Sequence, residues 1–205
     1  MEDVLNLYAQ PLDPSRPVVC FDEMPVQMVS ETRRPLPAKP GQPERYDYEY
    51  KREGVANTFM FFRPLAGWRH VKVTARRTKR DFADCMKDLV DIHFPDAEVI
   101  RVVLDNLNIH TLAALYAAFS PEEARRIASK LEFHYTPRHG SWLNMVEIEL
   151  SVFNRQCLAR RIPSRDALEN EARAWQTARN ACQATVNWRF TTEKARQKLH
   201  WLYQS

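Results

Sequence analysis

Two acidic residues, each directly after a short apolar run, constrain the fold of this chain more than any other feature. Residues 18–21 read VVCF before Asp22, and residues 102–104 read VVL before Asp105. Apolar, β-branched runs that stop at an acid are typical of buried parallel strands. Ligands of open α/β sheets bind at the carboxyl edge of such strands. The sequence therefore predicts an α/β fold with two carboxylates at a ligand-binding edge.

A third acid, Glu147, is predicted to project from a helix. Ser141 is a suitable N-cap, and residues 142–161 contain neither Gly nor Pro. On this helix Glu147 belongs to a polar stripe, whereas Glu149 lies about 200° away. The stripe consists of Asn144, Glu147, Ser151 and Asn154.

Asp22 is followed directly by a second acid, Glu23. Because successive residues of a strand point to opposite faces, only one of the two can face a shared metal site. Asp22, Asp105 and Glu147 can converge on one point, where three carboxylates would repel one another and raise their pKa values unless a cation neutralised them. A hard divalent ion such as Mg²⁺ suits three acids without a cysteine. We expect two Mg²⁺ ions, for which Mn²⁺ can substitute, held about 3.5–4 Å apart for attack on a phosphodiester.

Length and composition favour one domain over residues 1–205, with 44% hydrophobic residues. No apolar stretch approaches the ~20 residues that span a bilayer, and the first residues, MEDV, do not resemble a signal peptide. We therefore expect a cytoplasmic protein and no membrane partner. The four cysteines are widely spaced without a Cys-x-x-Cys pair, which predicts reduced structural thiols.

Basic residues cluster in segments 76–80, 125–126 and 155–165, within a net charge of +4. Such clusters suit a polyanionic partner, although solvated helix faces remain the alternative for each one. Strands are predicted over 17–28, 56–63, 68–74, 99–104 and 131–135, with the first three antiparallel. Helices are predicted over 78–92, 111–119, 121–130, 142–161 and 164–188.

The three acidic segments also carry a family resemblance. Residues 21–23 (FDE), 104–110 (LDNLNIH) and 135–147 (YTPRHGSWLNMVE) closely resemble the bacterial insertion-sequence branch of the mariner-type DDE transposases. The resemblance implies an RNase H-like, retroviral-integrase-type fold: a mixed five-stranded sheet flanked by helices, with extra C-terminal helices over 164–205. In several relatives the third motif reads Pro-Asp-Leu-Asn-Pro-x-Glu, and this chain keeps its Leu-Asn-x-x-Glu part.

By this resemblance, Asp22, Asp105 and Glu147 form the catalytic and metal-binding triad for DNA strand cleavage and strand transfer in transposition. The resemblance gives supporting or DNA-contacting roles to six further residues. Two of them have an alternative: His110 could have a structural role at the start of a helix, and Trp142 could lie in the core. His134 and His139 lack a third ligand at zinc spacing, which favours a structural or phosphate-contact role. The six supporting residues are Asn106, His110, Arg138, His139, Trp142 and Asn144.

The expected partners are DNA, both transposon ends and target, and a second copy of the chain. The proline-rich segment 31–53 resembles the clamp loop of mariner-type transposases, so we expect it to form a homodimer contact; a mobile surface loop is the alternative. Relatives carry N-terminal helix-turn-helix modules, for which the first sixteen residues leave no room. A separate DNA-reading transposase half could supply them.

Two other functions stay open at the level of sequence. One is a partner-dependent or catalytically incompetent fragment that binds DNA or full-length transposase and regulates transposition. The other is an RNase H-type nuclease that acts on RNA–DNA hybrids.

Overall fold

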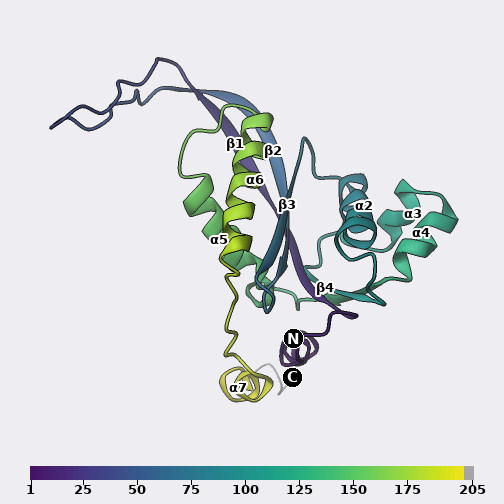
Figure 1. Ribbon diagram of the computed structural model, residues 1–205. Coiled ribbons are helices and arrows are strands. Elements are labelled where there is room, and N and C mark those ends of the chain that lie inside the picture. The colour runs from purple at the N-terminus through teal and green to yellow at the C-terminus, as the bar shows by residue number, and fades with distance from the viewer. Residues whose placement is uncertain (201–205) are drawn as a thin grey trace.

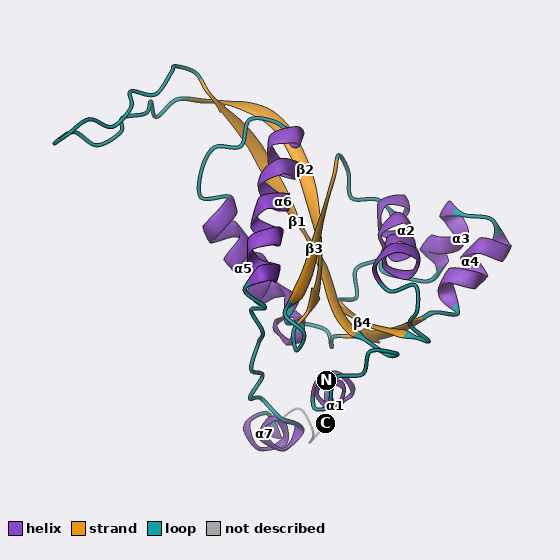
Figure 2. Ribbon diagram, viewed as in Figure 1, coloured by secondary structure: helices purple, strands orange, loops and turns teal. Residues whose placement is uncertain are grey.

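A five-stranded mixed sheet forms the centre of the protein in the computed structural model, which describes residues 1–200 (Figures 1 and 2). The spatial order of the strands is β3-β2-β1-β4-β5. Strands β1, β2 and β3 pair antiparallel, whereas β1, β4 and β5 pair parallel. This arrangement confirms the predicted fold class. The strands are β1 (Val18–Glu31), β2 (Tyr50–Arg63), β3 (Trp68–Thr74), β4 (Ile100–Leu104) and β5 (Leu131–Tyr135).

Helices cover both faces of the sheet, with α2, α3 and α4 on one side and α5 and α6 on the other (Figure 1). Each face has its own apolar core, because alternate residues of β1 point to opposite sides. Cys20 packs on the α5–α6 side, and Val19 and Phe21 pack on the α2–α4 side. The helices are α1 (Glu2–Tyr8), α2 (Lys79–Asp88), α3 (Ala113–Ala118), α4 (Pro121–Ala128), α5 (Val146–Cys157), α6 (Arg165–Ala181) and α7 (Thr192–Lys198).

The register between β1 and β4 positions the first two acids. Cys20 pairs with Val103 in the parallel ladder, and two residues further along, Asp22 comes level with Asp105. Strand β4 ends just before Asp105. Strand β1 runs past Asp22 to Glu31 against β2, three residues beyond the predicted end at 28. The edge on which the two acids meet is therefore the end of β4, not the end of β1.

Side-chain caps begin four of the described helices, α2, α4, α6 and α7, with Thr191 as the cap of α7. Ser120 and Ser164 accept hydrogen bonds from the backbone N–H groups of Glu123 and Ala167, as their sequence positions predict. Thr78 and Asp81 form a reciprocal capping box at the start of α2. These caps fix where α2, α4 and α6 begin.

Three predicted helices differ from the structure by more than two residues or in the type of helix. Helix α5 spans Val146–Cys157 rather than 142–161, because Asn144 is extended and separates it from a short 3-10 helix at Ser141–Leu143. Ser141 is therefore not the cap of α5. Helix α6 ends at Ala181, shortly before Gln183 turns with φ 45°, and the 78–92 helix passes into a π-helical turn at Leu89–His93. Helix α1 was not predicted, whereas α7 lies within the C-terminal helical extension predicted over 164–205, of which residues 201–205 lie outside the described part of the chain.

Segment 32–49 extends the β1–β2 hairpin into an arm that projects from the body (Figure 2). Two isolated bridges, Leu36 with Arg45 and Lys39 with Gln42, continue the hairpin towards a turn at Gly41. Tyr48 in this arm is 94% exposed. The arm continues the hairpin, and its side chains Tyr46 and Tyr48 are exposed.

Candidate active site

Asp22 is a half-buried carboxylate with little to neutralise it. Its Oδ1 accepts a hydrogen bond from the backbone N–H of Glu23 at 2.8 Å. Burial, followed by the negative charges of Glu23 and Asp105, raises the pKa of Asp22 to about 7, despite that bond and the nearby His110. An anion held in such surroundings favours a bound cation.

Asp105 is connected to Glu23 through the ring of His110. Its Oδ1 contacts His110 Nδ1 at 2.7 Å and accepts a hydrogen bond from the backbone N–H of Leu107 at 3.0 Å. The other ring nitrogen, Nε2, lies 2.9 Å from Glu23 Oε2. Arg77 Nη1 completes the row, 3.2 Å from Glu23 Oε1.

The contacts along the row Arg77–Glu23–His110–Asp105 shift the pKa values of His110 and Asp105. Burial acts to lower the pKa of His110, but the hydrogen bonds to Asp105 and Glu23 outweigh burial and raise that pKa to about 9. The bond to His110 in turn lowers the pKa of Asp105. His110 is fully buried against the rings of Phe21 and Phe82. Asp105 is thus held as an anion by a residue that apolar packing fixes in place.

Glu147 lies in the first turn of α5, and the start of this helix is fastened to β1. The buried side chain of Asn144 donates from Nδ2 to the carbonyl of Phe21, next to Asp22, at 2.8 Å. From α1, the Tyr8 hydroxyl donates to the Leu143 carbonyl at 2.9 Å. Two side chains therefore fix the start of α5, the helix that carries Glu147, against β1 and α1.

The rival acid on α5 has a different environment. Glu149 is 1% exposed and forms an ion pair with Arg69, which is fully buried on β3. Arg179 of α6 donates to both oxygens of Glu149, at 2.9 and 3.0 Å. Glu149 therefore connects α5 to β3 and α6.

The other predicted site residues differ in what they contact. Asn106 donates to the carbonyl of Thr136, which joins the loop after β4 to the end of β5. Arg138 and His139 are exposed in the loop before α5, where His139 has a positive φ of 61°. Trp142 is 46% exposed and packs edge-on against Phe190. Of these four, Asn106 alone has a contact that supports the carboxylate edge.

His134 is part of a separate surface cluster. Its ring nitrogens lie 2.8 Å from Asp3 and 2.9 Å from Glu132. These contacts favour a structural role for His134 in joining α1 to β5.

Three features that bear on the site were not predicted: the Tyr8 anchor, the Glu23–His110 contact and the pairing of Arg77 with Glu23. The Asp-Glu pair in FDE was a usable signal for Glu23, and the basic run 76–80 was one for Arg77. Tyr8 lies in α1, a helix that was not predicted.

The three carboxylates predicted as metal ligands are of a kind that suits a hard divalent cation, but they are not gathered around one point. Asp22, Asp105 and Glu147 offer carboxylate oxygens, the ligand type that Mg²⁺ and Mn²⁺ prefer. Across residues 1–200, no three His, Cys, Asp or Glu side chains are already gathered as a metal-binding group. The two aspartates lie near one another at the edge of β4, since the charge of Asp105 acts on Asp22, and Glu147 lies in the first turn of α5.

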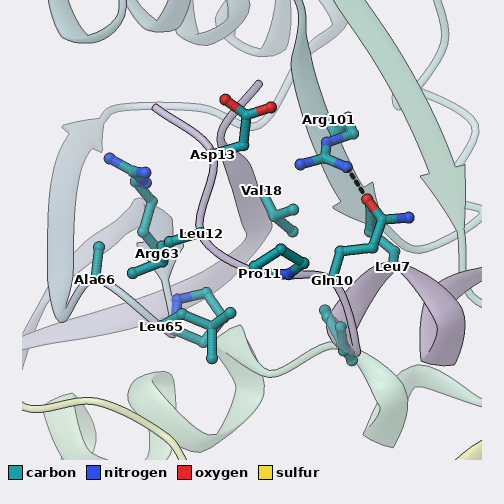
Figure 3. A pocket seen from close by; sticks show the side chains of 12 residues that line it. Leu7, Gln10, Pro11, Leu12, Asp13, Val18, Arg63, Leu65, Ala66 and Arg101 are labelled. Atoms are coloured by element: carbon teal, nitrogen blue, oxygen red, sulfur yellow. Dashed lines mark hydrogen bonds between the residues drawn. The ribbon is translucent and has the colours of Figure 1, made fainter. Parts of the chain in front are cut away.

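A small cavity lies at the opposite end of the strands (Figure 3). It is enclosed by the segment after α1 and by the β2–β3 turn, with Arg63 and Leu65 among its lining residues. Arg101 reaches across to Gln10 on its wall. None of the three acids lines this cavity, so it is separate from the candidate site.

The strand order of the sheet and the helices on both of its faces define an RNase H-like fold. Among solved structures, the Mos1 mariner paired-end complex with Mn matches with a TM-score of 0.55 at 16% identity. The match covers 88% of this chain and 54% of the Mos1 chain, so the protein spans about half the length of that relative. A simian T-cell lymphotropic virus intasome, in complex with a PP2A subunit, matches at 10% identity with a TM-score of 0.47, over 77% of this chain and 48% of the other.

The family itself is established by sequence. The profile of the DDE superfamily endonucleases matches residues 17–169, which include all three acids. The chain belongs to the DDE superfamily of endonucleases. No curated protein sequence matches it.

Proposed function

We propose that the protein is a transposase catalytic domain that cleaves DNA strands and transfers the cut ends during DNA transposition. The observation that carries this proposal is the pairing of Asp22 with Asp105 at the end of β4, with the start of α5 fastened beside them. Membership of the DDE endonucleases supports nuclease chemistry. The resemblance of the fold to a mariner paired-end complex supports DNA as the substrate.

We assign Asp22, Asp105 and Glu147 as the ligands of two Mg²⁺ ions, with Mn²⁺ as a substitute. Bound by these carboxylates, the ions would supply activation of a water or a DNA 3′-hydroxyl and stabilisation of the leaving oxygen for in-line attack on a phosphodiester. Both hydrogen bonds that hold Asp105 fall on Oδ1, and within the described residues none falls on Oδ2. Asp105 therefore presents Oδ2 in a fixed direction.

Asn144 acts as a positioning residue in this proposal. It is fully buried and bonded to the β1 backbone, so it sets where the first turn of α5 stands relative to Asp22. Asn106 has a related role through Thr136, which itself donates from its backbone N–H to the Leu104 carbonyl at 2.9 Å. Both residues act on the backbone that carries the acids.

The exposed basic residues near the acidic edge are the proposed DNA contacts. Arg77 is 44% exposed on its side chain and stands next to Glu23, while Arg138 and His139 are exposed in the loop before Glu147. Contacts of this kind bind phosphates and position DNA without reading its sequence. Recognition of particular transposon ends would therefore depend on another DNA-reading part.

The arm at 32–49 is the proposed dimer contact. Its base is fixed by Arg161, which donates to the Asp47 carbonyl at 2.7 Å and the Glu49 carbonyl at 2.9 Å. Its exposed Leu36, Tyr46 and Tyr48 are 65%, 66% and 94% accessible. A rigid base with exposed apolar side chains suits docking on a second copy of the chain.

Nicking of supercoiled plasmid in the presence of Mg²⁺ or Mn²⁺ tests the proposal. Metal-dependent nicking by the wild type, lost in Asp105→Asn and Glu147→Gln, is the expected result. Asp96→Asn and Glu122→Gln, which change exposed acids outside the site, are the matched controls and should nick normally. Nicking that survives in both triad variants would refute the assignment, and an inactive wild type would favour a partner-dependent fragment.

A further inference from the structure

The row Arg77–Glu23–His110–Asp105 contains one buried carboxylate, Glu23, to which the triad gives no role. Its side chain is 3% exposed, and both of its oxygens are occupied, Oε1 by Arg77 and Oε2 by His110. It follows Asp22 directly on β1 and so points to the opposite face of the sheet. Glu23 is therefore next to the metal-binding edge without a free oxygen to offer a metal.

His110 transmits the position of Glu23 to Asp105. The ring is 0% exposed and lies between two aromatic side chains, 5.5 Å from the Phe21 ring centre and 5.0 Å from that of Phe82. A ring in this slot can still rotate about its Cβ–Cγ bond unless its nitrogens are held. The contact of Nε2 with Glu23 Oε2 at 2.9 Å holds the ring so that Nδ1 faces Asp105.

The consequence for Asp105 is a choice between its two oxygens. Because carboxylates accept, a ring that bonds to both acids donates an N–H from each nitrogen. The donation from Nδ1 at 2.7 Å engages Asp105 Oδ1. An acid held by one oxygen presents the other one in a single direction, which is how partners behind a metal ligand orient it.

We propose that Glu23 is a positioning residue for the metal site: it orients His110, which in turn fixes Asp105 so that one oxygen faces the cation. This inference rests on the proposed function, since it assigns Asp105 as a metal ligand. It departs from the simplest alternative for an Asp-Glu pair, in which Glu23 itself binds the metal.

Direct Mn²⁺ binding, followed by electron paramagnetic resonance of the free ion, tests this role without requiring DNA cleavage. Glu23→Met, which removes the acceptor, should weaken Mn²⁺ binding about tenfold, within the range found for partners of metal ligands. Glu23→Gln keeps an acceptor oxygen for His110 and should recover most of the affinity. Glu98→Met, which changes an exposed acid, is the control and should bind as the wild type does.

A double-mutant cycle separates positioning from direct ligation. In a His110→Phe background, whose ring fits between Phe21 and Phe82, Glu23→Met should cause no further loss, because its effect passes through His110. A full additional loss in that background, or unchanged affinity in Glu23→Met alone, would overturn the proposal. Thermal unfolding of each variant checks that it is folded.

The hydrogen bonds of the His110 ring give a readout that is independent of metal. In the metal-free wild type, NMR should show two slowly exchanging ring N–H protons on His110, and Glu23→Met should lose the Nε2–H signal. Absence of the Nε2–H signal in the wild type would contradict the proposed contact. If the wild type shows both protons but fails to bind Mn²⁺, the metal assignment fails while the Glu23–His110 contact stands.

Discussion

Two buried glutamates of this protein lie close in sequence to a predicted catalytic acid, yet their surroundings differ. Glu23 follows Asp22 directly, and Glu149 lies two residues after Glu147. Glu149 lies between two arginines in a closed cluster, with side chains of Glu149 and Arg69 that are 2% and 0% exposed. Glu23 belongs to a row that opens to solvent through Arg77 and ends at Asp105, which is 34% exposed. The first cluster is complete, whereas the second stands beside an acid, Asp22, that lacks a cation.

The difference shows how a structural charge cluster can be distinguished from a functional one. In the Glu149 cluster, Arg69 also donates to the carbonyls of Gly67, Arg179 and Ala184, so its charge is distributed over fixed acceptors. At the edge of β4, burial and two neighbouring carboxylates raise the pKa of Asp22 instead. A site that costs stability in the absence of a ligand is a candidate for binding one.

Breaking the closed cluster should have the largest effect on stability. Glu149→Gln leaves Arg69 buried without its anion, and removal of one partner of a buried ion pair costs about 3–5 kcal/mol. We expect a loss of about 3 kcal/mol in the free energy of unfolding, measured by urea denaturation. A loss below about 1 kcal/mol would mean that Glu149 does not hold β3, α5 and α6 together.

Neutralising Asp22 should raise the free energy of unfolding, the opposite of the effect expected for Glu149→Gln. The pKa of Asp22 is about 7 in the folded protein against the ordinary 3.8, so its ionisation destabilises the fold progressively as the pH rises from about 4 to 7. Asp22→Asn removes this cost, and we expect a gain of about 2 kcal/mol at pH 8 without metal, and no gain near pH 4. Urea denaturation at both pH values checks this, and equal effects at the two would contradict it.

The histidine pair His70 and His93 sharpens the comparison, because neither residue belongs to the candidate metal site and the pair should respond to pH without involving a metal. Burial, with the neighbouring His93, lowers the pKa of His70 to about 4, and Asp88 and Lys72 also face it. Since the unfolded chain takes up the proton near pH 6.5, stability should fall by about 2 kcal/mol as the pH drops from about 6.5 to 4. His70→Phe keeps a ring beside Phe61 and should flatten this dependence in thermal unfolding scans.

Loosening the arm should have the smallest effect on global stability. Arg161 contacts the base of the arm, and its guanidinium carbon lies 5.9 Å from the ring centre of Tyr46 and 5.7 Å from that of Tyr50. Arg161→Ala should cost less than about 1 kcal/mol of global stability, while cleavage by trypsin within 32–49 becomes several-fold faster. Arg165→Ala, at an exposed ion pair of α6, is the control; equal cleavage rates in both variants would refute the anchoring role.

Local patterns predicted the elements that position the first two acids. Apolar runs before Asp22 and Asp105 indicated β1 and β4, and the β4–β5 segments match their predicted positions closely. The start of α5 could not be predicted from helical spacing, because Asn144 leaves the helical conformation to bond with the distant Phe21 carbonyl. For the same reason Glu23 and His110, which are 87 residues apart, gave no local sign that they meet.

The sequence was also silent about buried charge on β3. Arg69 shares a face of β3 with Val71, but an arginine is ordinarily exposed, and its full burial among the described residues was not predicted. Its acceptors come from α5, α6 and the segment after α6. Tertiary contacts of this kind determine burial, and periodicity alone does not reveal them.

Mn²⁺ binding to the protein without DNA tests the central claim most directly, because the claim concerns Asp22 as an acid that awaits a cation. Isothermal titration should show that the wild type and Glu122→Gln bind Mn²⁺ alike and that Asp22→Asn does not bind it. Binding of Mn²⁺ by Asp22→Asn with wild-type affinity would contradict the account, because the carboxylate that the structure leaves uncompensated would then have no part in holding the metal.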